Sequence, residues 1–278
     1  METGIQFAYV ASAVLFIFGL KQLGSPATAR RGNMISSLGM LVAVVAALLS
    51  QGIDYTYILM GFAIGGAIGA AAARLVQMTS MPEMVALFNG FGGMASLLVG
   101  AAALSGATGT FTLVTIVLSI LIGGVTFTGS IVAWGKLSET FSSGAVQFGG
   151  QQVVNSLIVL AVIASGVMFC LQPENPNWLY LMVGLSLLFG IMAVIPIGGA
   201  DMPVVISLLN SYSGLAACAA GFAINNNILI VAGSLVGASG IILTQIMCKA
   251  MNRSLSHVLF SGFASVSSEE TLHIFHGP

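Results

Sequence analysis

The sequence predicts an all-α protein, a polytopic bundle of about nine transmembrane helices. Of its 278 residues, 57% are hydrophobic and 5% are charged, whereas a soluble domain carries about 25% charged residues. Apolar runs long enough to cross a bilayer as helices recur along nearly the whole chain. These runs are continuous and do not alternate with polar residues, which argues against a membrane β-barrel.

Nine apolar segments carry this prediction. Asp54 precedes the third, Pro82 and Pro203 open the fourth and eighth, and a Gly- and Ser-rich loop, 134–151, separates the fifth from the sixth. The first segment has no basic stretch before it, so we expect a membrane span there and not a cleavable signal. In order, the predicted spans are 4–20, 33–50, 56–74, 82–104, 111–133, 152–171, 178–196, 202–223 and 227–248.

The basic residues predict the orientation. With nine spans, all seven Lys and Arg residues fall on one side of the membrane, and Glu2, Asp54 and Glu174 fall on the other. Because basic residues concentrate on the cytoplasmic side, we expect the N-terminus outside and the C-terminus in the cytoplasm or its equivalent. The basic residues are Lys21, Arg30, Arg31, Arg74, Lys136, Lys249 and Arg253.

Two parts of the chain repeat each other. Residues 81–95 align without gaps on residues 202–216, each with a proline near its start and an asparagine seven residues later. Such repeats are typical of transporters, and this one places Asn89 and Asn210 at similar depths. We infer two related three-helix units, at roughly 55–136 and 178–249.

Glycines at four-residue spacing predict close helix contacts. They occur as Gly61, Gly65 and Gly69 in the third span and as Gly233 and Gly237 in the ninth. Small residues at this spacing let helices approach each other in lipid. We therefore expect both glycine faces to pack against other helices.

Amides and hydroxyls are the polar groups expected inside the spans, which contain no His and no mid-span acid or base. Asn89 and Asn210 are the leading candidates for a proton pathway, because an amide at that depth needs partners that lipid does not supply. Thr128, Ser130 and Ser239 could extend a chain of water molecules, although a bond to its own helix backbone is the better explanation for each hydroxyl taken singly. We also expect Ser207, Asn210 and Gly214 on one face of the eighth span.

Charged residues gather at the cytoplasmic ends of the last two spans. Asp201 stands before Pro203 and fits a helix N-cap. Lys249 and Arg253 follow the ninth span, where cations complement the helix dipole. The three cysteines lie far apart, and no nucleotide-binding glycine motif or nucleophile–base pair is present. We therefore expect no catalytic residue, bound cofactor or metal in this chain, and its net charge of −1 gives no reason to expect nucleic acid.

Several motifs together resemble one family. About residues 1–262, every predicted span included, are similar to the membrane domain of the beta subunit of proton-translocating NAD(P) transhydrogenase. The motifs are Gly198-Gly199-Ala200-Asp201-Met202-Pro203, Leu209-Asn210-Ser211-Tyr212-Ser213-Gly214, Met247-Cys248-Lys249-Ala250-Met251-Asn252-Arg253-Ser254, Met81-Pro82 with Asn89-Gly90, and Val125-Thr126-Phe127-Thr128-Gly129-Ser130.

The resemblance implies a function and site roles. That family, the Re/Si-specific transhydrogenases, couples hydride transfer from NADH to NADP+ with inward proton flow. NAD(H) and NADP(H) bind to domains outside the membrane, so this chain alone is not expected to transfer hydride. By resemblance, Asp201 couples the membrane domain to the NADP(H)-binding domain, Lys249 and Arg253 lie beside the linker to it, and Asn210 lies on the proton path. Some members carry a proton-carrying His where this chain has Asn89. Other members have Asn there, and a His on a helix of the alpha-type subunit substitutes for it, which is what we expect for this chain.

The resemblance also implies partners and a location. They are an alpha-type subunit, an NADP(H)-binding domain and a second copy of the complex, in a bacterial inner membrane or, alternatively, a mitochondrial one. Short loops and a start at Met1 favour the bacterial origin. The tail, 263–278, does not resemble the family's linker into the NADP(H)-binding domain. We therefore expect a truncated linker or a non-native end there, and we expect this chain not to include that domain.

Two other functions stay open at this point. The repeats and central amides also suit a secondary transporter or channel for a small solute or ion, which predicts broken helices around a substrate cavity. A membrane scaffold without a pathway predicts that Asn210→Leu is harmless.

Overall fold

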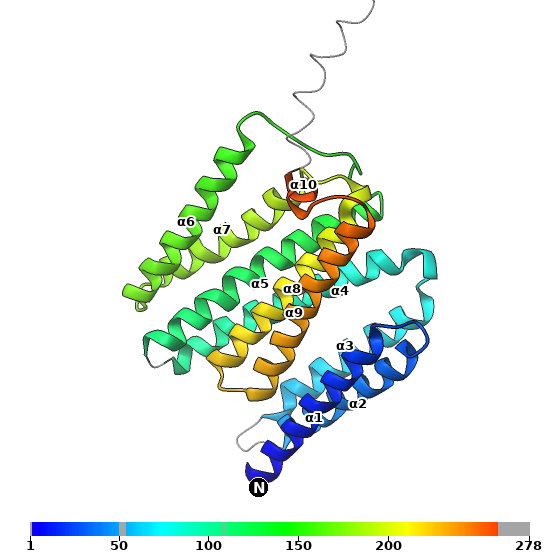
Figure 1. Cartoon of the computed structure of the whole chain (residues 1–278). Coiled ribbons are helices and arrows are strands. Elements are labelled where there is room, and N and C mark those ends of the chain that lie inside the picture. The colour runs from blue at the N-terminus through cyan, green and yellow to red at the C-terminus, as the bar shows by residue number, and fades with distance from the viewer. Residues whose placement is uncertain (1, 50–53, 108, 261–278) are drawn as a thin grey trace, which may run out of the picture.

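The computed structural model describes residues 2–49, 54–107 and 109–260. This part of the chain contains helices and no strand, and nine of its helices are long and apolar enough to cross a membrane, as predicted. They are α1 (Glu2–Leu23), α2 (Ala29–Leu48), α3 (Tyr55–Leu75), α4 (Met81–Ala102), α5 (Thr110–Leu137), α6 (Gln151–Leu171), α7 (Pro176–Val194), α8 (Met202–Ala223) and α9 (Asn227–Ala250), followed by the short α10 (Leu255–Phe260) (Figure 1). The predicted tail, 263–278, lies outside the described residues.

Short polar side chains begin several of these helices. The Asp54 carboxylate accepts the N–H of Thr56 at the start of α3, at 2.9 Å. Asn226 does the same at the start of α9, where its amide oxygen lies 3.0 Å from the N–H of Leu229. Such caps satisfy N–H groups that have no partner within the helix, so the local sequence explains where these spans begin.

The core consists of two helix hairpins, α4–α5 and α8–α9, that pack on each other. Each hairpin closes on glycine: a Cβ added to Gly93 would lie 2.8 Å from the Gly123 carbonyl oxygen, and one added to Gly214 would lie 2.8 Å from that of Gly233. Gly93 and Gly214 occupy the same position of the sequence repeat. The predicted packing of the ninth span through its glycines is confirmed.

The start of each hairpin repeats as well. One 3-10 turn precedes α4 (η1, Met78–Ser80) and another precedes α8 (η3, Gly199–Asp201), and both helices carry proline in their first turn. The first helices of the predicted three-helix units differ, however. Helix α7 packs against α5 and α6, whereas α3 makes no extensive contact with another helix of the described chain. The similarity in packing is therefore confined to the hairpins.

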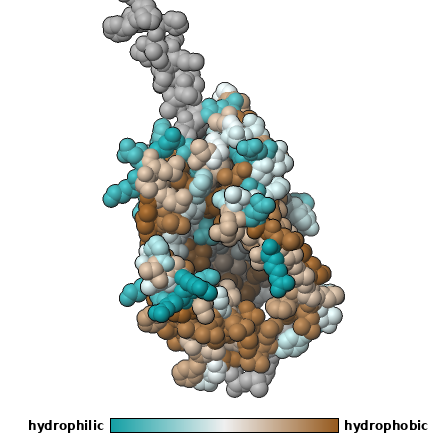
Figure 2. All heavy atoms as spheres, turned by 90° about the vertical axis from the view of Figure 1, so that its right-hand side faces the viewer, coloured by the Kyte–Doolittle hydropathy of each residue, from teal (hydrophilic) through white to brown (hydrophobic). Residues whose placement is uncertain are grey.

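The glycine face of α3 corrects one expectation. No residue of α3 is buried, and a Cβ added to Gly61, Gly65 or Gly69 would meet nothing within 4 Å. The prediction that this face packs is wrong for the described chain taken alone, because α3 stands apart from the core. Figure 1 shows α1–α3 to one side of the group that contains α4–α9, and α1 packs against α9. Seen from the right-hand side of that view, the molecule is hollowed near its centre (Figure 2).

Candidate functional site

Three helices meet at one buried amide in the core. Asn89 of α4 donates through Nδ2 to Ser130 Oγ of α5 at 2.9 Å. Ser213 of α8 donates to Asn89 Oδ1 at 2.8 Å. Asn89 is 9% exposed and Ser130 is fully buried. We call Asn89, Ser130 and Ser213 the central cluster; it joins residues 124 positions apart in the sequence.

Small residues let the helices come close enough for these bonds. A Cβ added to Gly90, next to Asn89, would lie 3.2 Å from Ser130 Cβ and 3.3 Å from the Phe127 carbonyl oxygen. Larger side chains there would push α4 away from α5 and lengthen the bond between Asn89 and Ser130. The sequence thus supplies both the polar groups and the space in which they meet.

The central cluster is polar but contains no group that titrates near neutral pH. An amide and two hydroxyls can donate and accept hydrogen bonds and can bridge to water. They can therefore order water molecules, but none of them takes up and releases a proton near neutral pH. Among the described residues, no group of His, Cys, Asp and Glu side chains could hold a metal ion.

Asn210 lies on α8, three residues before Ser213, and is not a member of the central cluster. At 3.6 residues per turn it falls on α8 between Ser213, which faces α4, and Ser207, which faces α9. Ser207 Oγ lies 3.3 Å from the Gly240 carbonyl oxygen of α9. Helices α4 and α9 make no extensive contact, and Asn210, which is half-buried, lies on the side of α8 between them. The predicted face of α8 is therefore present, with Asn210 at its border.

Two predicted pathway residues lie away from the central cluster. Thr128 donates to the Leu187 carbonyl oxygen of α7 at 2.7 Å, so it joins α5 to α7 on another face. Ser239 donates to the Val236 carbonyl oxygen of its own helix at 3.0 Å. Ser213, in contrast, was not among the predicted site residues. Its place one turn from Asn210 was visible in the sequence, but the helix that it faces was not.

An ion pair closes the α8–α9 hairpin at the end where α8 begins and α9 ends. Both carboxylate oxygens of Asp201 lie 2.8 Å from Nη1 of Arg253. Asp201 is 6% exposed, whereas the Arg253 side chain is 41% exposed. The capping prediction for Asp201 is wrong in detail, because its side chain makes no capping bond. The carboxylate is directed to Arg253 instead.

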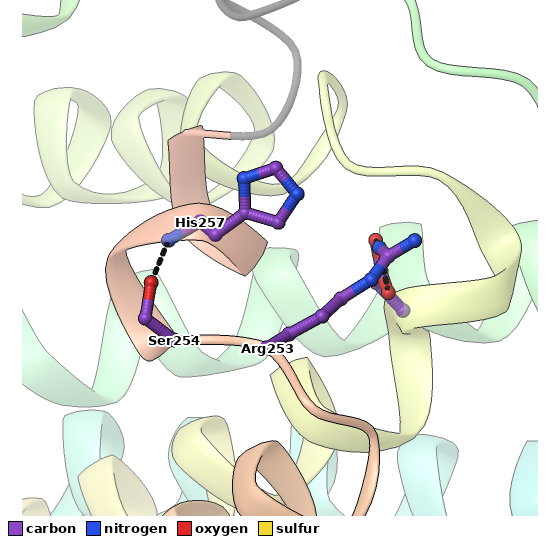
Figure 3. Close-up of polar contacts among 4 residues, drawn as sticks. Arg253, Ser254 and His257 are labelled. Carbon is purple, nitrogen blue, oxygen red and sulfur yellow. Dashed lines mark hydrogen bonds and ion pairs between the residues drawn. The ribbon is translucent and has the colours of Figure 1, made fainter.

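The turn after α9 positions the arginine. The N–H of Arg253 donates to the Cys248 carbonyl oxygen at 2.9 Å, and Ser254 Oγ accepts the N–H of His257 at 3.1 Å to begin α10. Figure 3 shows Arg253 extending from this turn, with His257 on α10 above it in that view. Lys249 is exposed, and no ion pair to it is present in the described part of the chain. The structure therefore brings together two of the three predicted coupling residues.

Comparison with known proteins finds a matching family and two similar curated proteins. The family described as "NAD(P) transhydrogenase beta subunit" matches residues 5–274. Two curated relatives, both named NAD(P) transhydrogenase subunit beta, come from Rhodospirillum rubrum and from a strain of that species. Each is 42% identical over 269 residues, which cover 93% of this chain and 58% of the relative. The chain thus spans little more than half the length of these relatives.

Proposed function

The chain belongs to the NAD(P) transhydrogenase beta subunit family, and we propose that it forms the proton-conducting membrane part of a transhydrogenase complex. It is a multi-pass membrane protein. In this proposal, proton flow through its helices is coupled to hydride transfer from NADH to NADP+. Soluble domains of the complex bind the nucleotides and carry out the transfer, and the complex lies in a bacterial inner membrane, with a mitochondrial inner membrane as the alternative.

The central cluster is the observation that carries the proposal. A buried amide in a membrane span is costly unless it is bonded, and such groups usually mark a pathway. Here Asn89 takes one hydroxyl partner from α5 and another from α8. These bonds create a continuous polar contact across the two core hairpins. Thr128 and Ser239 bond elsewhere, so we place them outside the innermost part of the path.

The open side of the cluster supports a partner subunit. No hydrogen bond to the Asn210 side chain is present among the described residues, and Asn210 is only half-buried. We propose that helices of an alpha-type subunit cover this side of α8 and bring an intramembrane His to Asn89 and Asn210. The same subunit, or a second copy of the complex, could cover the free glycine face of α3.

The ion pair supports a coupling role at the cytoplasmic end. Asp201 stands at the start of α8, which carries Ser213, and Arg253 stands just beyond α9. A soluble NADP(H)-binding domain that bound Asp201 or Arg253 would break this ion pair and change the position of α8. Exposed Lys249 offers that domain a cation on the same side of the membrane.

A transporter for small solutes is less well supported. Each described span is a continuous helix, whereas the transporter alternative predicts broken ones. A cavity of about 760 Å³ lies among α6, α7 and α8, but its lining is mostly apolar and includes no member of the central cluster.

The test is a reconstituted complete complex that carries Asp201→Asn or Asn210→Leu. Proton pumping and reverse transhydrogenation are measured on the same proteoliposomes. Loss of pumping together with slowed reverse transfer supports the proposed path. Wild-type pumping and reverse transfer in both variants would refute the assignment of these site residues. A harmless Asn210→Leu would favour the alternative of a membrane scaffold without a pathway.

A further inference from the structure

Lys136, in the last turn of α5, is buried without an acidic partner. The residue is 2% exposed, and no carboxylate pairs with it among the described residues. Its ammonium group donates to three carbonyl oxygens: Gly144 at 2.9 Å, Ile195 at 2.6 Å and Ile197 at 2.7 Å. All three donors of the ammonium group therefore have a partner.

This geometry is unlike that of a lysine that merely marks the cytoplasmic side. Such a lysine extends its charged end towards water. Lys136 instead turns inward, where an ammonium is costly unless hydrogen bonds replace its hydration. Ile195 follows the last residue of α7, so the charge also meets the negative end of that helix.

The carbonyl groups belong to two segments that are held together. One is the α5–α6 loop, 138–150, and the other is the segment 195–201, which we call the α7–α8 connector. The N–H of Gly199 donates to the Ser143 carbonyl oxygen at 2.8 Å, and that of Val146 donates to the Ile195 carbonyl oxygen at 3.3 Å. Lys136 stands where α5, the loop and the connector meet.

The connector ends in Asp201, and α5 also carries Ser130. Six residues separate Ser130 from Lys136, a rise of about 9 Å along the helix. Helix α5 thus contacts the central cluster at one level and holds the connector at the next. We propose that Lys136 is a positioning residue for coupling, which ties Asp201 to the helix that contains Ser130. This inference rests on the proposed function. It makes α5, in addition to α8, a structural link between the ion pair and the central cluster.

Substitutions of Lys136 in the complete complex test the inference. Lys136→Met removes the charge and all three donors, whereas Lys136→Gln removes the charge and keeps two N–H donors. Both should lower the number of protons moved per hydride, the methionine variant to the level of Asp201→Asn and the glutamine variant by less. Lys21→Met is the matched control, because Lys21 is an exposed lysine on the same side of the membrane, and it should pump normally.

A double-variant cycle separates positioning from general damage. If Lys136 acts through Asp201, adding Lys136→Met to Asp201→Asn causes no further loss of coupling. Additive losses would overturn the inference, as would normal coupling in Lys136→Gln alongside a coupling loss in Asp201→Asn. Normal pumping in both Asp201→Asn and Asn210→Leu would instead overturn the proposed function.

If neither Lys136 variant assembles, amide hydrogen exchange in the wild-type complex tests whether the connector is held in place. The N–H of Gly199 should exchange at least roughly tenfold more slowly than in an unstructured peptide, because the connector is held in place. Exchange as fast as in the peptide would show that the connector is loose and would overturn the inference.

Discussion

Ser213→Ala is expected to impair proton movement far more than it loosens the fold. The Ser213 hydroxyl donates to Asn89 Oδ1 at 2.8 Å, and the substitution removes this donor without adding volume. The amide oxygen of Asn89, a 9% exposed residue, then keeps no donor from α8. The same hydroxyl also lies 3.3 Å from the Asn89 backbone carbonyl oxygen, so the perturbation is the loss of one shared donor at the centre of the proposed path.

The expected loss of stability is small. Hydrogen bonds between membrane helices contribute about 0.6 kcal/mol on average and up to about 1.7 kcal/mol. An acceptor left buried and unsatisfied raises the cost towards about 1–3 kcal/mol. We therefore expect about 1–2 kcal/mol, which lowers the ratio of folded to unfolded protein about 5–30-fold. The complex should still assemble.

Ser12→Ala is the matched control. The Ser12 hydroxyl is fully buried and donates to the Gly39 carbonyl oxygen at 2.7 Å, between α1 and α2. The same atom is deleted and a bond between helices is again lost, but outside the central cluster. The two variants should therefore differ little in stability.

Two assays on the same preparations decide the question. Unfolding in denaturing detergent measures stability, and a pH-sensitive dye in proteoliposomes measures proton movement during hydride transfer. Ser213→Ala should lower proton movement at least roughly tenfold, equivalent to about 1.4 kcal/mol in a rate-limiting barrier, whereas Ser12→Ala should pump normally. Equal pumping by the two variants would refute the reasoning.

Three further substitutions and one titration extend the test. Gly214→Val should prevent accumulation of the chain in membranes, because the valine side chain would overlap the α9 backbone. Gly61→Val should accumulate normally but reduce co-purification of partner subunits. Normal co-purification of Gly61→Val would argue that no helix covers α3. Arg253→Gln should slow coupled transfer and lower stability by only about 1 kcal/mol, measured by thermal unfolding, since the arginine side chain is partly exposed to solvent. Hydrogen bonds from Thr56, first its backbone N–H and then its hydroxyl, lower the pKa of Asp54 below its ordinary value. The stabilisation that the Asp54 cap gives α3 is thus fully present at pH values above the ordinary pKa of an aspartate, and it is lost as the pH falls through the lowered pKa of Asp54. A ¹³C titration of the carboxyl group that gave a pKa at or above the ordinary one would contradict this.

Composition and charge were enough to predict the nine spans. Each span must satisfy its own backbone bonds within the helix, so length and apolarity define it locally. Asn89 could be chosen as a site residue for a similar reason, since a buried amide needs partners. In these respects the local sequence carries the information.

Contacts between distant segments could not be predicted in the same way. The sequence places Ser213 on a face of α8, but only the packing of α4 shows that it meets Asn89. Thr128 looked equivalent to Ser130 two residues away, yet it faces α7. Lys136 served only to orient the chain, because its burial depends on a loop and a connector that meet it in space. Asp201 was assigned a cap because its partner, Arg253, lies 52 residues away.

The central claim is that the polar contact at Asn89 lies on the proton path. Its most direct test is the number of protons moved per hydride in the reconstituted complex that carries Asn89→Leu, beside Asn155→Leu as the control. Asn155 is also an amide in a span, and it donates to the Met192 carbonyl oxygen at 3.4 Å, away from the cluster. We predict that Asn89→Leu abolishes coupled proton movement while Asn155→Leu retains it. Wild-type proton movement in Asn89→Leu would contradict the account.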